Sequence, residues 1–251
     1  MRRAFLGRRG IVSAAGAGRL PCPLAMGPSR GIGSALLALV ALAAALRWAG
    51  LDRLQPHVQE SDWYVVLQMQ MHRNGSVHAG QPPVAYFAYP TLAARALAWI
   101  PEARLDPDLG ADAFLAGSLA AASADVVRVR TAVALVSTLL VPLTWLLARR
   151  FLGGGPALVA AASVAFSALH LLFSQQARPH GLQATCALAS VLLALRMRAR
   201  PTLGAYLCGA LAAGLAFAFL HNGLAALLPL LAAHWLRDRG ADSPRAGFAW
   251  W

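Results

Sequence analysis

Two short polar segments, residues 57–64 and 174–180, stand out in a chain that is otherwise mostly apolar. The first contains two carboxylates, Glu60 and Asp62, and the second contains Arg178. A carboxylate can remove a proton from an attacking hydroxyl, and a guanidinium can form two parallel hydrogen bonds to a phosphate. If the fold brings the two segments to one membrane surface, these residue types suit a phosphate-linked lipid substrate.

Five further side chains are candidates for substrate contacts: Arg130, His57, Tyr64, Tyr89 and His180. Arg130 can bind the same phosphate or simply anchor its own helix. The tyrosines can form a belt at the membrane–water interface or stack on a sugar. Histidines near carboxylates can bind a divalent cation, and that alternative stays open. No ligand spacing requires one, so we predict no metal and no cofactor.

The composition is that of a membrane protein. The 251 residues are 58% hydrophobic and 13% charged, whereas a soluble domain is about 25% charged. The formal net charge is +12, and every basic residue other than histidine is an arginine. Such a charge on a soluble protein would suggest nucleic acid, but cytoplasmic loops of membrane proteins also collect arginine. We therefore predict an integral membrane protein without a nucleic-acid partner.

Six apolar segments are long enough for transmembrane helices, which need about 20 residues. The predicted fold class is therefore an all-α integral membrane protein, with residues 32–236 as one polytopic domain. The six segments are Ile32–Leu51, Thr131–Ala148, Ala157–Phe173, Pro179–Leu195, Leu203–Leu220 and Phe219–Leu236.

A seventh apolar stretch, Val84–Pro101, is assigned from the placement of charge. The N-terminal tail, residues 1–31, contains six arginines and should stay cytoplasmic. A count of six spans puts the later arginine clusters on that same side, and a count of seven moves them outside. Burial of Arg95 would also cost about 2.5–3.5 kcal/mol. We therefore predict six spans, with Val84–Pro101 as an interfacial helix. The later clusters are Arg149/Arg150, Arg196/Arg198/Arg200 and Arg237/Arg239/Arg245.

This topology makes residues 52–125 one long outer loop, which holds eight of the ten acids of the chain. It also places residues 57–64 and 174–180 on the same face of the membrane. Residues 237–251 would be a cytoplasmic tail or the point at which a longer protein is cut.

The order of these features resembles the GT-C membrane glycosyltransferases, in particular the protein O-mannosyltransferases, the aminoarabinose transferases and their bacterial relatives. That family has a first span, an outer loop that opens with an acidic motif, and then a Pro-Pro or Tyr-Pro element. The next span opens with an arginine, here Arg130, and ends in a basic turn, here residues 149–153. A Ser-x-x-Ala-Arg-Pro segment follows, matched by residues 174–179.

The resemblance covers residues 32–236 and implies an enzyme. Its reaction would move a hexose or pentose from a polyprenyl-phosphate donor to a hydroxyl of an acceptor glycan, lipid or protein, outside the cytoplasm. The enzyme would be a multi-pass protein in contact with the lipids of the plasma membrane, with a cytoplasmic N-terminus. The implied catalytic residues are Glu60 and Asp62, the phosphate ligands Arg178 and Arg130, and the substrate contacts His57, Tyr64, Tyr89 and His180.

The sequence departs from the family at Gln59, where the acidic pair normally begins with an aspartate. Either Glu60 or, after a local shift, Asp62 then supplies the base, or the protein is catalytically impaired. The chain also ends at Trp251, short of the usual length, which indicates an N-terminal portion that starts at Met1 or Met26.

Plainer interpretations compete with this one. Glu60 and Asp62 can be ordinary loop acids, and Arg178 can be a helix-end arginine that reaches lipid headgroups. The alternative function is a transporter or a non-catalytic membrane scaffold. A transporter is expected to have polar or broken helices at mid-bilayer and repeated halves, whereas the predicted spans are apolar at their centres.

Overall fold

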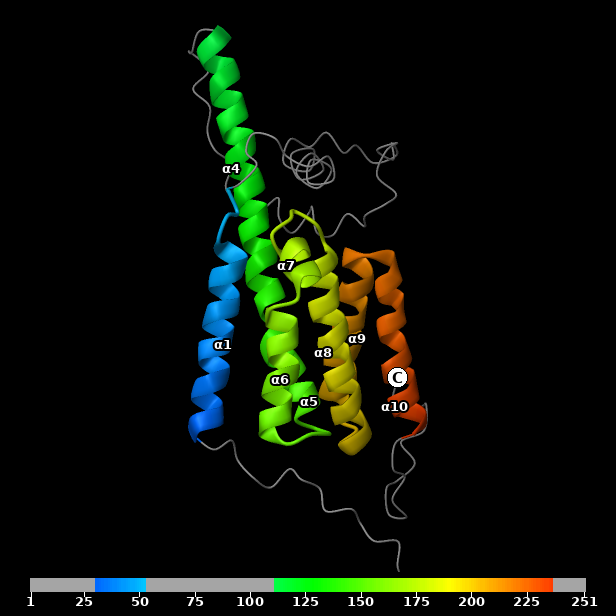
Figure 1. Cartoon of the computed structure of the whole chain (residues 1–251). Helices are drawn as coiled ribbons and strands as arrows, with labels where there is room; N and C mark the ends of the chain where they lie inside the picture. The colour runs from blue at the N-terminus through cyan, green and yellow to red at the C-terminus, as the bar shows by residue number, and fades with distance from the viewer. Residues whose placement is uncertain (1–29, 53–110, 237–251) are drawn as a thin grey trace, which may run out of the picture.

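The computed structural model describes residues 30–52 and 111–236, which form a bundle of helices (Figure 1). No strand occurs within these two ranges, in agreement with the predicted all-α class. The elements are α1 (Arg30–Trp48), α4 (Ala111–Thr138), α5 (Leu140–Ala148), α6 (Gly154–Ala165), α7 (Ala168–Ser174), α8 (His180–Ala199), α9 (Leu203–Phe219), the 3-10 helix η2 (His221–Ala226) and α10 (Leu227–Trp235).

The helices lie roughly antiparallel to their neighbours in the chain (Figure 1). α1, α6 and α9 run in one direction, and α4 with α5, α8 and α10 run in the other. α4 begins at Ala111, so the last part of the predicted outer loop, from residue 111 to 125, is helical. The predicted interfacial helix, Val84–Pro101, lies outside the described residues.

Three helical segments are long and apolar enough to cross a membrane: Gly31–Trp48, Ser123–Ala148 and His180–Ala199. α6 and α7 make a fourth if the bent pair counts as one span, because their axes differ by 56°. α9 has 17 residues and α10 has nine, which is less than a full crossing usually takes. The described residues thus support three or four spans, and the six predicted are not confirmed.

Two local breaks explain the difference. At Ser167 the backbone is extended (ψ 117°), and the Ser167 hydroxyl accepts a hydrogen bond from the amide of His170, at 3.4 Å. A serine N-cap of this kind starts a new helix, so the predicted span Ala157–Phe173 becomes α6 and α7. At Leu220 the backbone is extended again (φ −155°), and the chain then forms η2 in place of a continuous final span.

Two arginine clusters lie at one end of the bundle, and Arg178 lies at the other. The α5–α6 turn holds Arg149 and Arg150, and the last turn of α8 holds Arg196 and Arg198. Both lie at the end of the bundle opposite to the α7–α8 connection, which contains Arg178 (Figure 1). The predicted grouping of these two clusters on one side therefore agrees with the fold.

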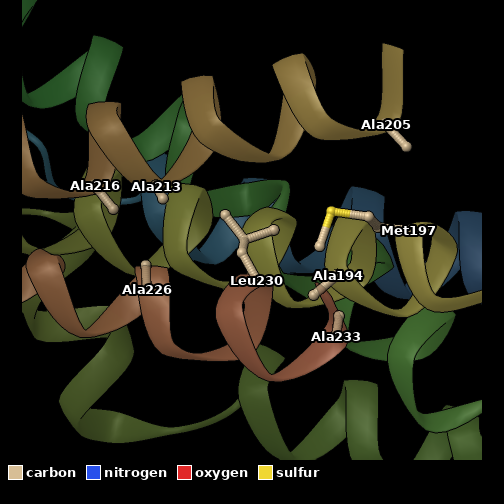
Figure 2. Close-up of a cluster of buried hydrophobic side chains, with 8 residues drawn as sticks. All are labelled: Ala194, Met197, Ala205, Ala213, Ala216, Ala226, Leu230 and Ala233. Carbon is tan, nitrogen blue, oxygen red and sulfur yellow. The ribbon is translucent and has the colours of Figure 1, made fainter. Parts of the chain in front are cut away.

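Small side chains let the helices approach closely. Between α8, α9 and the η2–α10 segment, alanines surround two larger residues, Leu230 and Met197 (Figure 2). On α6, a fully buried alanine recurs at every fourth position, namely Ala157, Ala161 and Ala165. These alanines belong to a cluster shared with α1 and α5. Membrane helices associate through such small-residue faces, because apolar surface alone gains little by leaving lipid.

Gly223, in η2, is a position where the backbone packing leaves no room for a side chain. A Cβ there would overlap the backbone carbonyl of Ala216 and lie 2.7 Å from the amide nitrogen of Phe217. We expect Gly223→Ala to destabilise the fold by about 1–3 kcal/mol, because a helix backbone cannot yield as a side chain can. Thermal unfolding in detergent measures this as a lower Tm. The control is Gly214→Ala on α9, where a Cβ meets nothing within 4 Å, and an equal Tm for both variants would contradict the packing.

Labelling with a membrane-impermeant thiol reagent tests which end faces the cytoplasm. In a chain without its native cysteines, we expect Arg178→Cys to react from outside intact cells and Arg150→Cys and Arg198→Cys to be protected. The reason is the positive-inside tendency together with the opposite placement of these residues in the bundle. Reaction of position 150 with protection of position 178 would reverse the orientation, and equal reaction of both would contradict the bundle.

Candidate functional site

The predicted site residues that the structure describes belong to one end of the bundle. This end, called the exit end below, holds the C-terminal end of α1 with residues 49–52, the α7–α8 connection (residues 175–179) and η2 (Figure 1). Arg178 and His180 lie in or next to the connection, and Arg130 of α4 is bonded to Leu51. The other predicted residues, namely His57, Glu60, Asp62, Tyr64 and Tyr89, lie outside the described residues.

Arg130 is a buried cation that holds the end of α1. Its side chain is 4% exposed, and its Nη1 donates a hydrogen bond to the carbonyl oxygen of Leu51, at 3.0 Å. The two residues are 79 positions apart, so this bond fixes the point at which α1 ends relative to α4. At least part of the Arg130 guanidinium therefore acts as an anchor, one of the two roles that the sequence left open.

Gln175 holds the same helix end from the other side. Its Nε2 donates to the carbonyl oxygens of Leu46, at 2.9 Å, and Ala49, at 3.1 Å. Gln175 is the residue that follows α7, and it lies three positions before Arg178. The sequence analysis quoted this residue within a motif but assigned it no role. No local signal reveals it, because its partners are 126 and 129 positions away in the chain.

The α7–α8 connection packs on α4 through Ala177. This fully buried alanine shares a cluster with Val126, Val129 and Val133 of α4, which flank Arg130. The partly buried Arg178 follows it directly. The predicted phosphate ligands, Arg178 and Arg130, thus belong to two segments that are in contact.

His180, the first residue of α8, packs against an aromatic ring. Its imidazole is stacked on Phe173 with a centroid distance of 4.7 Å and an angle of 13° between the rings. This contact joins α8 to α7 across the connection that contains Arg178. This stacking gives a structural reason for an aromatic ring at position 180. A contact between the same ring and the substrate stays a prediction.

Asp125 is a buried acid on α4 that the sequence analysis had counted among the outer-loop carboxylates. It is 2% exposed, and its Oδ1 lies 3.3 Å from Nη1 of Arg128, which is 38% exposed. Buried carboxylates are costly unless they are paired, and this ion pair one turn along the helix meets that need. Asp125 adds a carboxylate to the segment of α4 that also contains Arg130.

Arg47 is a buried arginine inside α1 that the sequence analysis missed. It is fully buried, and its Nη1 donates to the carbonyl of Ala43, at 2.8 Å, back toward the middle of the helix. Among the residues that the structure describes, its Nε and Nη2 have no hydrogen-bond partner. Arg47 lies in the last turn of α1, so it does not contradict the expectation that the spans are apolar at their centres. Charged residues inside membrane helices usually mark functional sites, and an arginine within the predicted span Ile32–Leu51 was the available signal.

Arg47, Arg130 and Arg178 come from three elements that meet at the end of α1. Arg47 lies in the last turn of that helix, Arg130 bonds to Leu51, and Arg178 follows Gln175 in the connection that holds the helix end. Such a concentration of guanidinium groups is chemically suited to an oxyanion such as a phosphate. Within residues 30–52 and 111–236, no group of three or more His, Cys, Asp or Glu side chains could hold a metal ion.

Comparison with family models gives a match to a known family. The model of the family described as dolichyl-phosphate-mannose-protein mannosyltransferase matches residues 107–241, a little more than half of the chain. The matched range includes Arg130, Gln175 and Arg178, and so most of the described exit end. No curated protein and no solved structure gave a significant match. From the extent of this family match, the chain belongs to the dolichyl-phosphate-mannose-protein mannosyltransferase family.

Proposed function

We propose that the chain is the membrane-embedded part of a glycosyltransferase that moves a sugar from a polyprenyl-phosphate donor to an acceptor hydroxyl at the exit end. The observation that supports this most is the family match over residues 107–241, which spans the segments that meet around α1. The gathering of Arg47, Arg130 and Arg178 adds a chemical reason, because the donor carries a phosphate. The sugar is a hexose or pentose, and the acceptor is a glycan, lipid or protein.

The donor phosphate is bound by Arg178, with Arg130 as a second ligand. Arg178 is partly buried beside α4, so its guanidinium keeps little water and bonds a phosphate oxygen strongly. Arg130 already donates one N–H to Leu51, and the guanidinium has five N–H groups in all. His57, Tyr64, Tyr89 and His180 are proposed to contact the sugar or the lipid.

The base is Glu60, with Asp62 as the second candidate. In an inverting transfer, the carboxylate takes the proton of the acceptor hydroxyl while the acceptor oxygen bonds to the anomeric carbon. The bond from that carbon to the phosphate oxygen breaks, and the electron pair leaves with polyprenyl phosphate. General base catalysis of this kind typically contributes about 10²–10⁴-fold to the rate.

The orientation follows from the arginine clusters. We propose a multi-pass protein of the plasma membrane, with the N-terminus and the α5–α6 turn in the cytoplasm and the exit end outside. Eight of the ten acids of the chain lie between residues 52 and 125, on the exit side in this orientation. The transfer therefore takes place at the outer surface, where a lipid-linked donor presents its sugar.

Transport is the second candidate function. The 56° bend between α6 and α7 is a feature that transporters show in their broken helices. The family match favours the transferase, because that family is described by a transfer reaction. Uptake of a solute by proteoliposomes without any release of polyprenyl phosphate would favour the transporter.

Arg178 offers a test of donor binding. We expect Arg178→Ala to weaken binding of polyprenyl-phosphate mannose by about 10- to 100-fold, since hydrogen bonds to charged groups contribute about 1.5–3 kcal/mol. Arg178→Lys should lose less, because it keeps the charge but not the planar two-point contact. Binding is measured by quenching of a fluorescent donor analogue in detergent. The control is Arg150→Ala at the opposite end, and unchanged binding in Arg178→Ala would make Arg178 a headgroup anchor.

Glu60 and Asp62 offer a test of catalysis. In the full-length protein, Glu60→Gln should lower kcat by about 10²–10⁴-fold with little change in donor binding, because the amide cannot accept the proton. Asp62→Asn should have a smaller effect. Release of radiolabelled polyprenyl phosphate in the presence of acceptor measures both. Turnover at the wild-type rate in both variants would place the base elsewhere, and no transfer by the unmodified protein would identify Gln59 as the mark of a lapsed enzyme.

A further inference from the structure

The C-terminal end of α1 is closed partly by its own backbone. The amide of Ala49 donates to the carbonyl of Ala45, at 2.9 Å, and the amide of Leu51 donates to that of Trp48, at 3.3 Å. Gly50 has a φ of 83°, the left-handed conformation that ends many helices and that favours glycine. The last carbonyls of a helix have no partner within it, so these bonds leave other carbonyls at this end to be satisfied from elsewhere.

Two side chains from other elements bond three further carbonyls at this end. Gln175 donates to Leu46 and Ala49 from the end of α7, and Arg130 donates to Leu51 from α4. The bond from Arg130 to Leu51 is buried and the bond from Gln175 to Leu46 is partly buried, whereas the bond to Ala49 is exposed. The position of the end of α1 is therefore set by the two segments that carry the proposed donor ligands.

The side-chain NH₂ group of Gln175 donates to two backbone carbonyls that lie three residues apart, those of Leu46 and Ala49. An NH₂ group is the neutral donor with two hydrogens that a side chain can provide. Arg178 follows Gln175 by three residues. Between them in the chain, the buried Ala177 packs against valines of α4. A displacement of the end of α1 would therefore be a displacement relative to Arg178.

We propose that Gln175 is a positioning residue of the transfer reaction. Its amide fixes the helix end that leads, eight residues beyond Asp52, to Glu60. It thereby holds residues 46–49, which precede the segment with the proposed base in the chain, against the connection that carries Arg178. This inference rests on the proposed function, and it adds a residue that touches neither the sugar nor the phosphate.

The test compares Gln175→Glu with Gln183→Glu. The glutamate at position 175 has the same size, but it sets a carboxylate against two carbonyl oxygens and should release the end of α1. Gln183, in the first turn of α8, is partly exposed, and its side chain makes no hydrogen bond among the described residues. If Gln175→Glu fails to insert, Gln175→Met, which has a similar length but no donor, takes its place.

The first measurement is the distance distribution between spin labels at Asp52→Cys and Arg150→Cys in a chain without its native cysteines. Both positions are exposed, and they lie at opposite ends of the bundle (Figure 1). We expect a narrow distribution with the native Gln175 and with Gln183→Glu, and a broader one with Gln175→Glu. An unchanged distribution in Gln175→Glu would overturn the clamp on α1.

The second measurement is turnover per folded molecule of the full-length protein. We expect Gln175→Glu to lower kcat by about 10- to 100-fold, the effect of a misplacement by about an ångström, with an unchanged Kd for polyprenyl-phosphate mannose. A merely structural role would lower the amount of folded protein and leave kcat unchanged. Full turnover with a broadened distance distribution would overturn the positioning role. If the unmodified protein binds donor but transfers nothing, the proposed function and the positioning role fail together. The spin-label distances still show in that case whether Gln175 holds the end of α1.

Discussion

The need to satisfy the backbone carbonyls at the end of α1 is the constraint on which the exit end depends. A buried backbone carbonyl without a hydrogen-bond partner is costly, and the carbonyl of Leu51 is bonded at a buried position. Here Gly50 turns the chain, while Arg130 and Gln175 provide the missing donors. These two residues come from α4 and from the end of α7, so a local requirement of one helix joins three elements.

This constraint explains why polar residues gather where the chemistry is proposed. The segment that caps α1 also carries Arg178, and the same stretch of α4 carries the buried Asp125, paired with the exposed Arg128. A rigid frame of this kind is what a transfer reaction needs, since catalysis depends on holding donor and base at a fixed separation. Arg47 places one more cation at the end of α1, with two nitrogen atoms that have no hydrogen-bond partner within residues 30–52 and 111–236.

Periodicity and composition predicted the helical class, the grouping of two arginine clusters at one end, and the bounds of α8 and α9 to within a few residues. The break at Leu220 coincides with the predicted boundary between the last two spans. The break at Ser167 and the 3-10 helix η2 were not predicted, because an N-cap serine and a short 3-10 helix have little effect on the hydropathy of a long apolar run. Gln175 was beyond reach for another reason. Its role depends on partners 126 and 129 residues away, which no local pattern encodes. Arg47 could have been found from its place within an apolar span.

Photo-crosslinking of the donor tests most directly whether the exit end is the site of transfer. The probe is polyprenyl-phosphate mannose with a diazirine next to the phosphate, and mass spectrometry of the digested protein locates the attachment. We expect crosslinks within residues 123–131 and 174–180, and we expect unlabelled donor to compete with them. Crosslinks at the opposite end, around Arg149 or Arg198, or crosslinks that unlabelled donor does not reduce, would contradict a donor site at the end of α1.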